Sequence, residues 1–130
     1  MKHADVPAFT AGGKRILLGH AQLCLNVKSV RRSLGFYTRL GFRRIGGDLR
    51  RNYVILQNGS WQLGLFQGHI KENLVNFRGG DIPKVCAALK RKGVNPKRGP
   101  RAYEGGCDAE LVDPDGNVIY LDTTTEELLK

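Results

Sequence analysis

The sequence predicts an α+β fold in which two β-α-β-β-β modules form a single domain. Three observations predict this: short segments with alternating apolar residues, two amphipathic helical patterns, and a repeat of the helical pattern at an offset of 52 residues. A chain of 130 residues with 17 glycines has room for one compact domain with many turns. Neither module is long enough to bury a face of its own sheet, so the two should fold together.

The first module is expected between about residues 19 and 68. Residues 20–27 alternate between apolar and polar side chains, which predicts a half-buried strand. Ser29 then caps an amphipathic helix that ends at Gly41. Three short strands should follow, at residues 42–47, 52–59 and 60–68.

The second module, at about residues 73–123, repeats this order. A strand at residues 73–78 precedes a helix that is capped by Asp81 and ends at Gly93. Three more strands are expected at residues 95–100, 107–113 and 117–122. The helical stripe of this module consists of Ile82, Cys86 and Leu89, which correspond to Val30, Leu34 and Tyr37 at the same offset.

The segment Asp-Pro-Asp-Gly-Asn at residues 113–117 predicts a tight hairpin, because each residue suits a turn. It is expected to shape the backbone rather than to contact a ligand. Residues 1–18 are expected to form a flexible arm and residues 125–130 a short tail, on either side of the domain at residues 19–124.

The charge is strongly basic, with 21 Lys and Arg against 12 Asp and Glu, a net charge of +9. A nucleic-acid partner would explain this, but no motif of a nucleic-acid-binding fold accompanies the basic groups. These groups are short and are expected mainly on outer helix faces and loops, which favours a solvated surface. A ligand should then be neutral or anionic rather than cationic. A membrane span is excluded, because no apolar run approaches about 20 residues.

The cysteine pattern points to a reducing compartment. Cys24, Cys86 and Cys107 are odd in number, lie far apart and form no C-x-x-C pair. This disfavours both a disulfide framework and a zinc site. We therefore expect three free cysteines in a cytoplasmic protein.

Four segments resemble the vicinal oxygen chelate superfamily, which includes glyoxalase I, bleomycin-resistance proteins and extradiol dioxygenases. They lie at residues 25–42, 61–68, 79–94 and 111–122, and the resemblance covers residues 19–123. It implies that the strands form an open, curled mixed sheet, a half-barrel, with the helices on the outer face. It also implies a divalent metal held by four strand residues, and a possible homodimer.

The implied metal positions largely lack donors. They fall on Gln22, Gly64, Leu74 (or Val75) and Tyr120, so only Gln22 carries a competent ligand. The nearby residues with donor atoms that could substitute are Gln62, Asp108, Glu110 and Asp122. We therefore expect neither a metal nor another cofactor, and no residue is assigned a catalytic role.

Strand alternation nevertheless predicts the lining of a binding cavity. The predicted ligand-binding residues from this alternation are Gln22, Cys24, Asn26, Gln62, Gly64, Phe66, Leu74, Asn76, Tyr120 and Asp122, and the ligand-binding residue Trp61 is expected at the rim with Tyr53. Amides and aromatic rings in this mixture suit a small polar and aromatic molecule. Gly64 is expected to leave open space at the centre.

The leading hypothesis is a metal-free small-molecule-binding protein with its site in the sheet cavity. One alternative is an enzyme, a divergent glyoxalase-like lyase or isomerase with displaced metal ligands, or a dioxygenase-like protein. The other alternative is a basic nucleic-acid-binding protein. Tight binding of a metal would favour the enzyme, and salt-sensitive binding of oligonucleotides would favour the second alternative.

Overall fold

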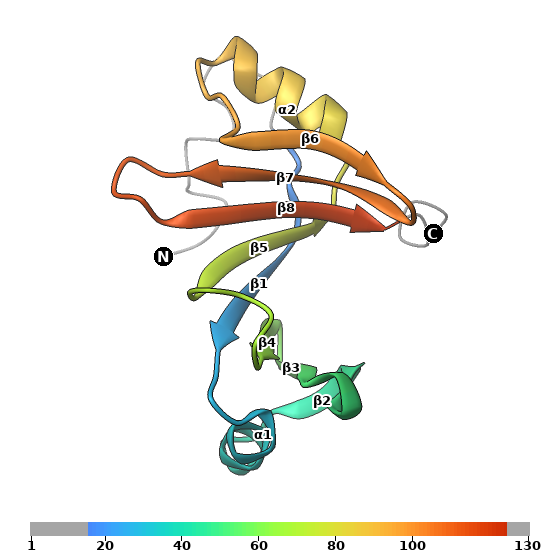
Figure 1. The fold of residues 1–130 in the computed structure, drawn as a ribbon, viewed down its shortest axis with the longest axis vertical. Coiled ribbons are helices and arrows are strands. Elements are labelled where there is room, and N and C mark those ends of the chain that lie inside the picture. The colour runs from blue at the N-terminus through green and yellow to red at the C-terminus, as the bar shows by residue number, and fades with distance from the viewer. Residues whose placement is uncertain (1–15, 125–130) are drawn as a thin grey trace.

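The computed structural model describes residues 16–124, which form one sheet with two helices (Figure 1). The bounds are β1 Gly19–Asn26, α1 Val30–Arg39, β2 Arg43–Asp48, η3 Leu49–Arg51, β3 Tyr53–Asn58, β4 Trp61–Phe66, β5 Leu74–Gly79, α2 Ile82–Arg91, β6 Arg98–Tyr103, β7 Gly106–Val112 and β8 Val118–Thr124. This is the expected β-α-β-β-β order, twice, with a short 3-10 helix (η3) that was not predicted. The predicted arm up to residue 15 and the predicted tail lie outside the described residues.

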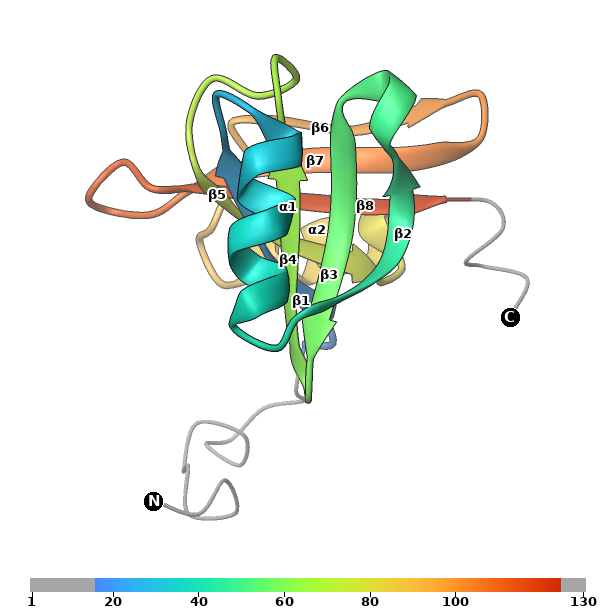
Figure 2. The same cartoon turned by 90° about the horizontal axis from the view of Figure 1, so that it is seen from below.

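The described strands form one mixed sheet in the order β2-β3-β4-β1-β5-β8-β7-β6. β1 and β5 pair antiparallel at its centre, and each pairs parallel with the last strand of its own module. The strands of one half run across those of the other, so the sheet is strongly curled (Figure 2). Both helices lie on one face, here called the outer face, and the opposite face is the inner face. The predicted open half-barrel is thus confirmed.

The two helices begin and end where the sequence indicated. In each, the N-cap side chain, Ser29 or Asp81, accepts a hydrogen bond from the backbone amide three residues later, at 3.3 and 3.2 Å. After each helix comes a glycine with positive φ, 104° at Gly41 and 83° at Gly93. The helices start 52 residues apart, as the repeat predicted.

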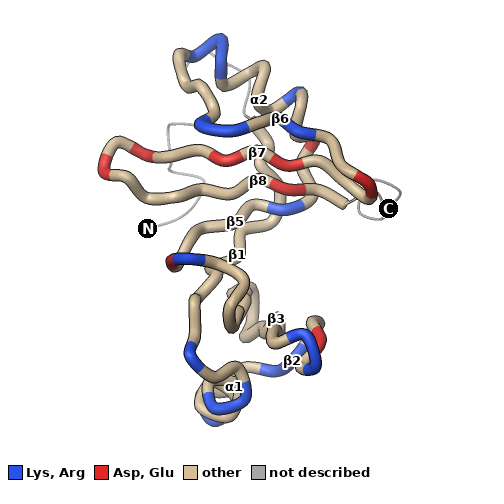
Figure 3. The backbone as a smooth tube through the Cα atoms, viewed as in Figure 1, with Lys and Arg blue, Asp and Glu red and all other residues tan. Residues whose placement is uncertain are grey.

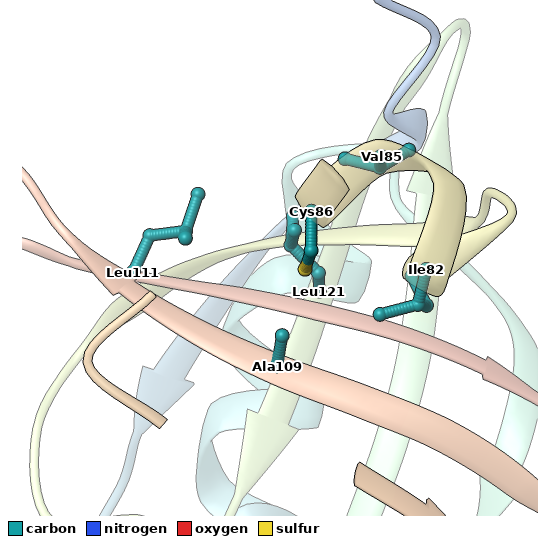
Figure 4. Packing of buried hydrophobic residues seen from close by; sticks show 6 residues of the cluster. All are labelled: Ile82, Val85, Cys86, Ala109, Leu111 and Leu121. Carbon is teal, nitrogen blue, oxygen red and sulfur yellow. The ribbon is translucent and has the colours of Figure 1, made fainter. Parts of the chain in front are cut away.

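The apolar core lies between the helices and the outer face, in two clusters. Under α1 the buried cluster consists of Val30, Val54, Leu56, Leu63 and Leu65. Under α2 it consists of Ile82, Val85, Cys86, Ala109, Leu111 and Leu121 (Figure 4). Ile16 and Leu18, within the predicted arm, also pack against this second cluster. The core thus uses the apolar half of each alternating strand, and the polar half is left on the inner face.

The DPDGN segment forms the predicted hairpin turn. The Asp113 carboxylate accepts hydrogen bonds from the backbone amides of Asp115 and Asn117, at 2.9 and 2.8 Å. β7 and β8 pair antiparallel on either side of the turn, beginning with Val112 opposite Val118. These contacts account for the turn without a ligand.

The sixth strand differs from the prediction, because β6 begins at Arg98 rather than at residue 95. β6 is at the edge of the sheet and is largely exposed. An exposed edge strand needs no apolar alternation, so the sequence gives little sign of its position or of the direction of its side chains.

The three cysteines form no disulfide, as predicted; Cys24 and Cys86 are buried, and Cys107 is partly exposed. Cys86 packs in the core under α2, where the thiol serves as a small apolar group. Within residues 16–124, neither helix has the length and apolar character that a membrane crossing requires.

Candidate functional site

The pairing register gathers polar side chains at the centre of the inner face. Gln22 of β1 lies opposite Asn76 of β5, Cys24 is level with Gly64 of β4, and Asn76 is level with Tyr120 of β8. Gln22, Cys24 and Asn76 are only 3%, 4% and 4% exposed. Since buried amides on a sheet face are uncommon, this centre is a candidate site.

Most of the other predicted site residues lie around this centre. Inner-face positions on the same strands hold Gln62, Phe66, Leu74 and Asp122. Asn26 is exposed at the end of β1, where its Nδ2 donates to the Lys71 carbonyl at 3.4 Å. The register therefore places residues from β1, β4, β5 and β8 on one surface.

Trp61 does not join this surface. It alternates along β4 with Leu63 and Leu65, which pack under α1 on the outer face. Its side chain is 56% exposed, beside the turn that joins β3 and β4. Trp61 was expected at the rim of the cavity, but it lies on the outer face, and we omit the residue from the candidate site.

Gly64 leaves no open space at the centre, contrary to the expectation. A Cβ atom at this position would lie 2.5 Å from the Phe66 ring and 2.8 Å from Nε2 of Gln22. These two side chains already fill the volume that a larger residue would take. Because Gln22 is only 3% exposed, a ligand would rest mainly on the partly exposed Phe66 ring and touch the edge of the Gln22 amide, rather than enter a pocket beneath them.

Three rings form an aromatic group next to this centre. Tyr53 and Phe66 stack with their centroids 5.7 Å apart and their planes 3° from parallel. His69 lies nearly perpendicular to both rings, at 81° and 82°, with centroid distances of 5.9 and 6.1 Å. His69 Nε2 also lies 2.6 Å from the carbonyl oxygen of Arg51, which helps to hold the ring in place. From the sequence, His69 was predicted only to lie in a loop and was given no role in the site.

The second half of the inner face carries a charged cluster around Asp108 of β7. Asp108 as a residue is 2% exposed, and its carboxylate accepts hydrogen bonds from Arg98 Nη1 at 3.1 Å, Arg101 Nη2 at 3.1 Å and the Tyr120 hydroxyl at 2.6 Å. Both arginines come from β6, whose register against β7 shifts between them. In Figure 3, acidic positions on β7 and β8 lie between basic positions on β6 and β5.

These hydrogen bonds set the protonation states in the cluster. Burial raises the pKa of the Asp108 carboxyl, but the bonds from Tyr120, Arg101 and Arg98 outweigh burial and hold this pKa below its ordinary value. The pKa of Tyr120 is raised well above its ordinary value, first by burial and then by its bond to Asp108. At neutral pH, Asp108 is therefore ionised and Tyr120 is a neutral phenol.

The other carboxylates on this half are also paired. Asp122 Oδ1 accepts a hydrogen bond from Asn76 Nδ2 at 2.8 Å and lies 3.7 Å from Nε of Arg78. Glu110 Oε2 lies 3.8 Å from Nζ of Lys97. Each acidic residue considered as a substitute metal ligand is thus matched with a cation.

The inner face does not fit the divalent metal that the sequence resemblance implies. Two of the four implied positions, Gly64 and Leu74, have no donor atom, and Tyr120 is a neutral phenol bound to Asp108. The possible substitute carboxylates already face cations, which repel a metal ion. Across residues 16–124, no three His, Cys, Asp or Glu side chains are grouped as metal ligands.

Arg98 and Arg101 were not among the predicted site residues, and Asp108 was considered only as a metal donor. Arg98 and Arg101 would not share a face of a regular strand, because they are three residues apart. The shift in register between them lets both side chains reach Asp108 on the inner face. One sequence signal was present: Asp108 and Glu110 alternate in β7 next to a basic segment at residues 97–101.

A groove lies on the other side of the molecule, between α2 and the start of β1. It has a volume of about 900 Å³, and its lining includes Leu17, Gly80, Lys84, Val85 and Ala88. Size alone would favour it as a ligand site. It contains none of the predicted site residues, so the chemical argument favours the inner face.

No protein-family model and no curated protein matches the sequence. The fold, however, is similar to solved structures. A protein described as NAD-dependent benzaldehyde dehydrogenase from Legionella pneumophila is 16% identical, with a TM-score of 0.67 over 81% of this chain and 99% of that chain. A glyoxalase/bleomycin resistance protein/dioxygenase superfamily member from Vibrio splendidus 12B01 is 14% identical, with a TM-score of 0.58 over 80% and 97%.

Methylmalonyl-CoA epimerase from Mycobacterium tuberculosis is also similar, at 14% identity and a TM-score of 0.59, over 94% of this chain and 98% of that chain. At such identities the likeness shows the fold alone. The chain has the vicinal oxygen chelate fold, that of the glyoxalase, bleomycin-resistance and dioxygenase superfamily, as the sequence resemblance predicted. The activities in these names belong to those proteins.

Proposed function

We propose that this chain binds a small molecule on the inner face of its sheet, without a divalent metal ion. One observation carries the proposal: the four strand positions implied as metal ligands hold Gln22, Gly64, Leu74 and Tyr120. Only the first offers a free donor atom, and one amide does not retain a divalent ion. The chain thus has the curved sheet of this fold, but its inner face lacks the metal-binding side chains that the resemblance implies.

The Gln22 amide supports a polar ligand. A buried amide is unfavourable unless it is hydrogen-bonded. The described contact of this side chain is from Nε2 to Sγ of Cys24, at 3.5 Å, and sulfur is a weak acceptor. A ligand with hydrogen-bonding groups would satisfy the amide better than the thiol does.

The aromatic group supports a ligand with a ring. Tyr53 and Phe66 are partly exposed, and their stacked rings offer a flat apolar surface beside the Gln22 amide. A molecule with both a ring and polar atoms would contact both features at once. This agrees with the polar and aromatic ligand expected from the sequence.

Two measurements on the purified protein test the proposal. Elemental analysis should find far less than one Ni, Zn, Fe or Mn per chain. An NMR screen of small aromatic probes should shift the resonances of Gln22 and Phe66. As a control, chelator-treated and metal-supplemented samples should bind the probes with equal affinity. One tightly bound metal per chain, whose removal abolishes probe binding, would contradict the proposal.

A further inference from the structure

We infer that the molecule bound on the inner face carries an oxyanion group, a carboxylate or a phosphate, which Arg98 and Arg101 bind. The inference rests on the proposed function and adds the charge and orientation of the ligand. It also assigns a role to two arginines that the sequence placed among solvated surface groups.

Asp108 holds the two guanidinium groups next to each other. Arg98 uses Nη1 on one carboxylate oxygen, and Arg101 uses Nη2 on the other, each at 3.1 Å. A guanidinium has five N–H donors, so each arginine keeps several donors for another acceptor. Oxyanions such as carboxylate and phosphate match this forked geometry.

The described ion pairs on this half of the inner face leave one cation in excess. Arg98 and Arg101 both bind the carboxylate of Asp108. Glu110 lies opposite Arg98 in register and attracts it, but it is also paired with Lys97. On either side the charges are matched, in the pairs Arg78–Asp122 and Lys97–Glu110. An anionic ligand would supply the missing negative charge.

The exposure of these side chains also suits a binding site. The Asp108 side chain is 3% exposed, whereas those of Arg98 and Arg101 are 37% and 58% exposed. The carboxylate thus lies beneath, and the guanidinium groups remain accessible to a ligand. Because each Asp108 oxygen accepts a hydrogen bond from one arginine, the carboxylate also fixes the direction of both guanidinium groups.

The two halves of the inner face therefore differ in chemistry. The aromatic group lies on β3, β4 and the loop after β4, and the arginine pair lies on β6 at the opposite edge of the sheet. In the curled sheet the strands of the two halves run across one another (Figure 2), and β1, β5, β8 and β7 lie between β4 and β6. Only an extended ligand would bring a ring to Phe66 and an oxyanion to Arg101, so a short probe tests the arginine end alone.

Three matched probes test the inference: benzoate, phenyl phosphate and the neutral benzyl alcohol. Their affinities are measured by NMR titration at physiological ionic strength, so that weak surface attraction is screened. At least one anionic probe should bind about tenfold more tightly than benzyl alcohol, as expected for a charged hydrogen-bonded contact. The better anion identifies the ligand as a carboxylate or a phosphate.

Variants then locate the anion. Arg101→Ala removes a half-exposed side chain, should fold, and should weaken the better anion about tenfold without affecting benzyl alcohol. Arg101→Lys keeps the positive charge but not the forked guanidinium group. Its affinity for the anion should lie between those of the wild type and Arg101→Ala. Arg31→Ala makes the same charge change at an exposed position of α1 and should have no effect.

The outcomes separate this inference from the proposed function. If benzyl alcohol shifts the inner-face resonances and binds as tightly as both anions, the inference is wrong and the proposed function stands. If Arg31→Ala weakens the anions as much as Arg101→Ala, the effect is one of overall charge and the inference is again wrong. If no probe shifts inner-face resonances, both are wrong.

Discussion

Asp108 shows at the scale of a single residue how the inner face tolerates a buried charge. Three donors, from Arg98, Arg101 and Tyr120, replace the water that the carboxylate loses. Because its pKa in the folded state is lowered, Asp108 stabilises the fold above the ordinary pKa of about 3.9. This contribution is lost as the pH falls through the lowered folded-state pKa.

Asp108→Asn should reduce the free energy of unfolding by about 1–3 kcal/mol at neutral pH, since an amide cannot match two guanidinium charges. The difference from the wild type should shrink below about pH 4, where the wild-type carboxylate also becomes neutral. Urea unfolding at several pH values measures this difference in the free energy of unfolding. Asp115→Asn, in an exposed turn, is the control and should have little effect at any pH. A deficit in Asp108→Asn that does not change with pH would contradict this account.

At the scale of the elements, two glycines within regular structure differ in the space available for a side chain. In β4, a side chain on Gly64 would meet the Phe66 ring and the Gln22 amide. In α1, the atom nearest to a Cβ on Gly35 is Nη1 of Arg39, at 3.8 Å, so there is room for a methyl group. Neither glycine has a positive φ, so the difference is one of packing.

Gly64→Ala should therefore destabilise the protein by about 1–3 kcal/mol, through overpacking of the inner face. Gly35→Ala should stabilise it by up to about 1 kcal/mol, because alanine favours the helix. The two variants are matched in chemistry, and urea unfolding compares them directly. Equal effects would show that Phe66 and Gln22 do not pack against Gly64 as described.

At the scale of the whole molecule, the two modules depend on each other through the central pairing of β1 with β5. Each module has its own core cluster, but neither module forms the whole inner face, because one sheet runs through both modules. This arrangement joins two repeats into one cooperative unit.

Unfolding of the two modules should therefore coincide. Trp61 is the single tryptophan and reports on the first module, while far-UV circular dichroism reports on both helices. Urea curves from the two probes should superimpose, with one midpoint and one slope. A fluorescence change that precedes the loss of helix would show that the modules unfold separately.

Much of the fold could be predicted because its signals are local. Ser29 and Asp81 cap helices through their own side chains, and Asp113 closes its turn in the same way. The faces of β1 follow from apolar alternation, since one face is buried under α1. β6 lacks such a buried face, and its start was misplaced by three residues.

Sequence patterns alone predict the two-module architecture, the helix bounds and the lack of metal donors at the implied positions. The packing of Phe66 and Gln22 over Gly64 and the meeting of Arg98 and Arg101 at Asp108 are seen only in the folded chain. The physical reason is the same in both cases. These contacts depend on side-chain directions and strand register across the curled sheet, which neither alternation nor local propensity specifies.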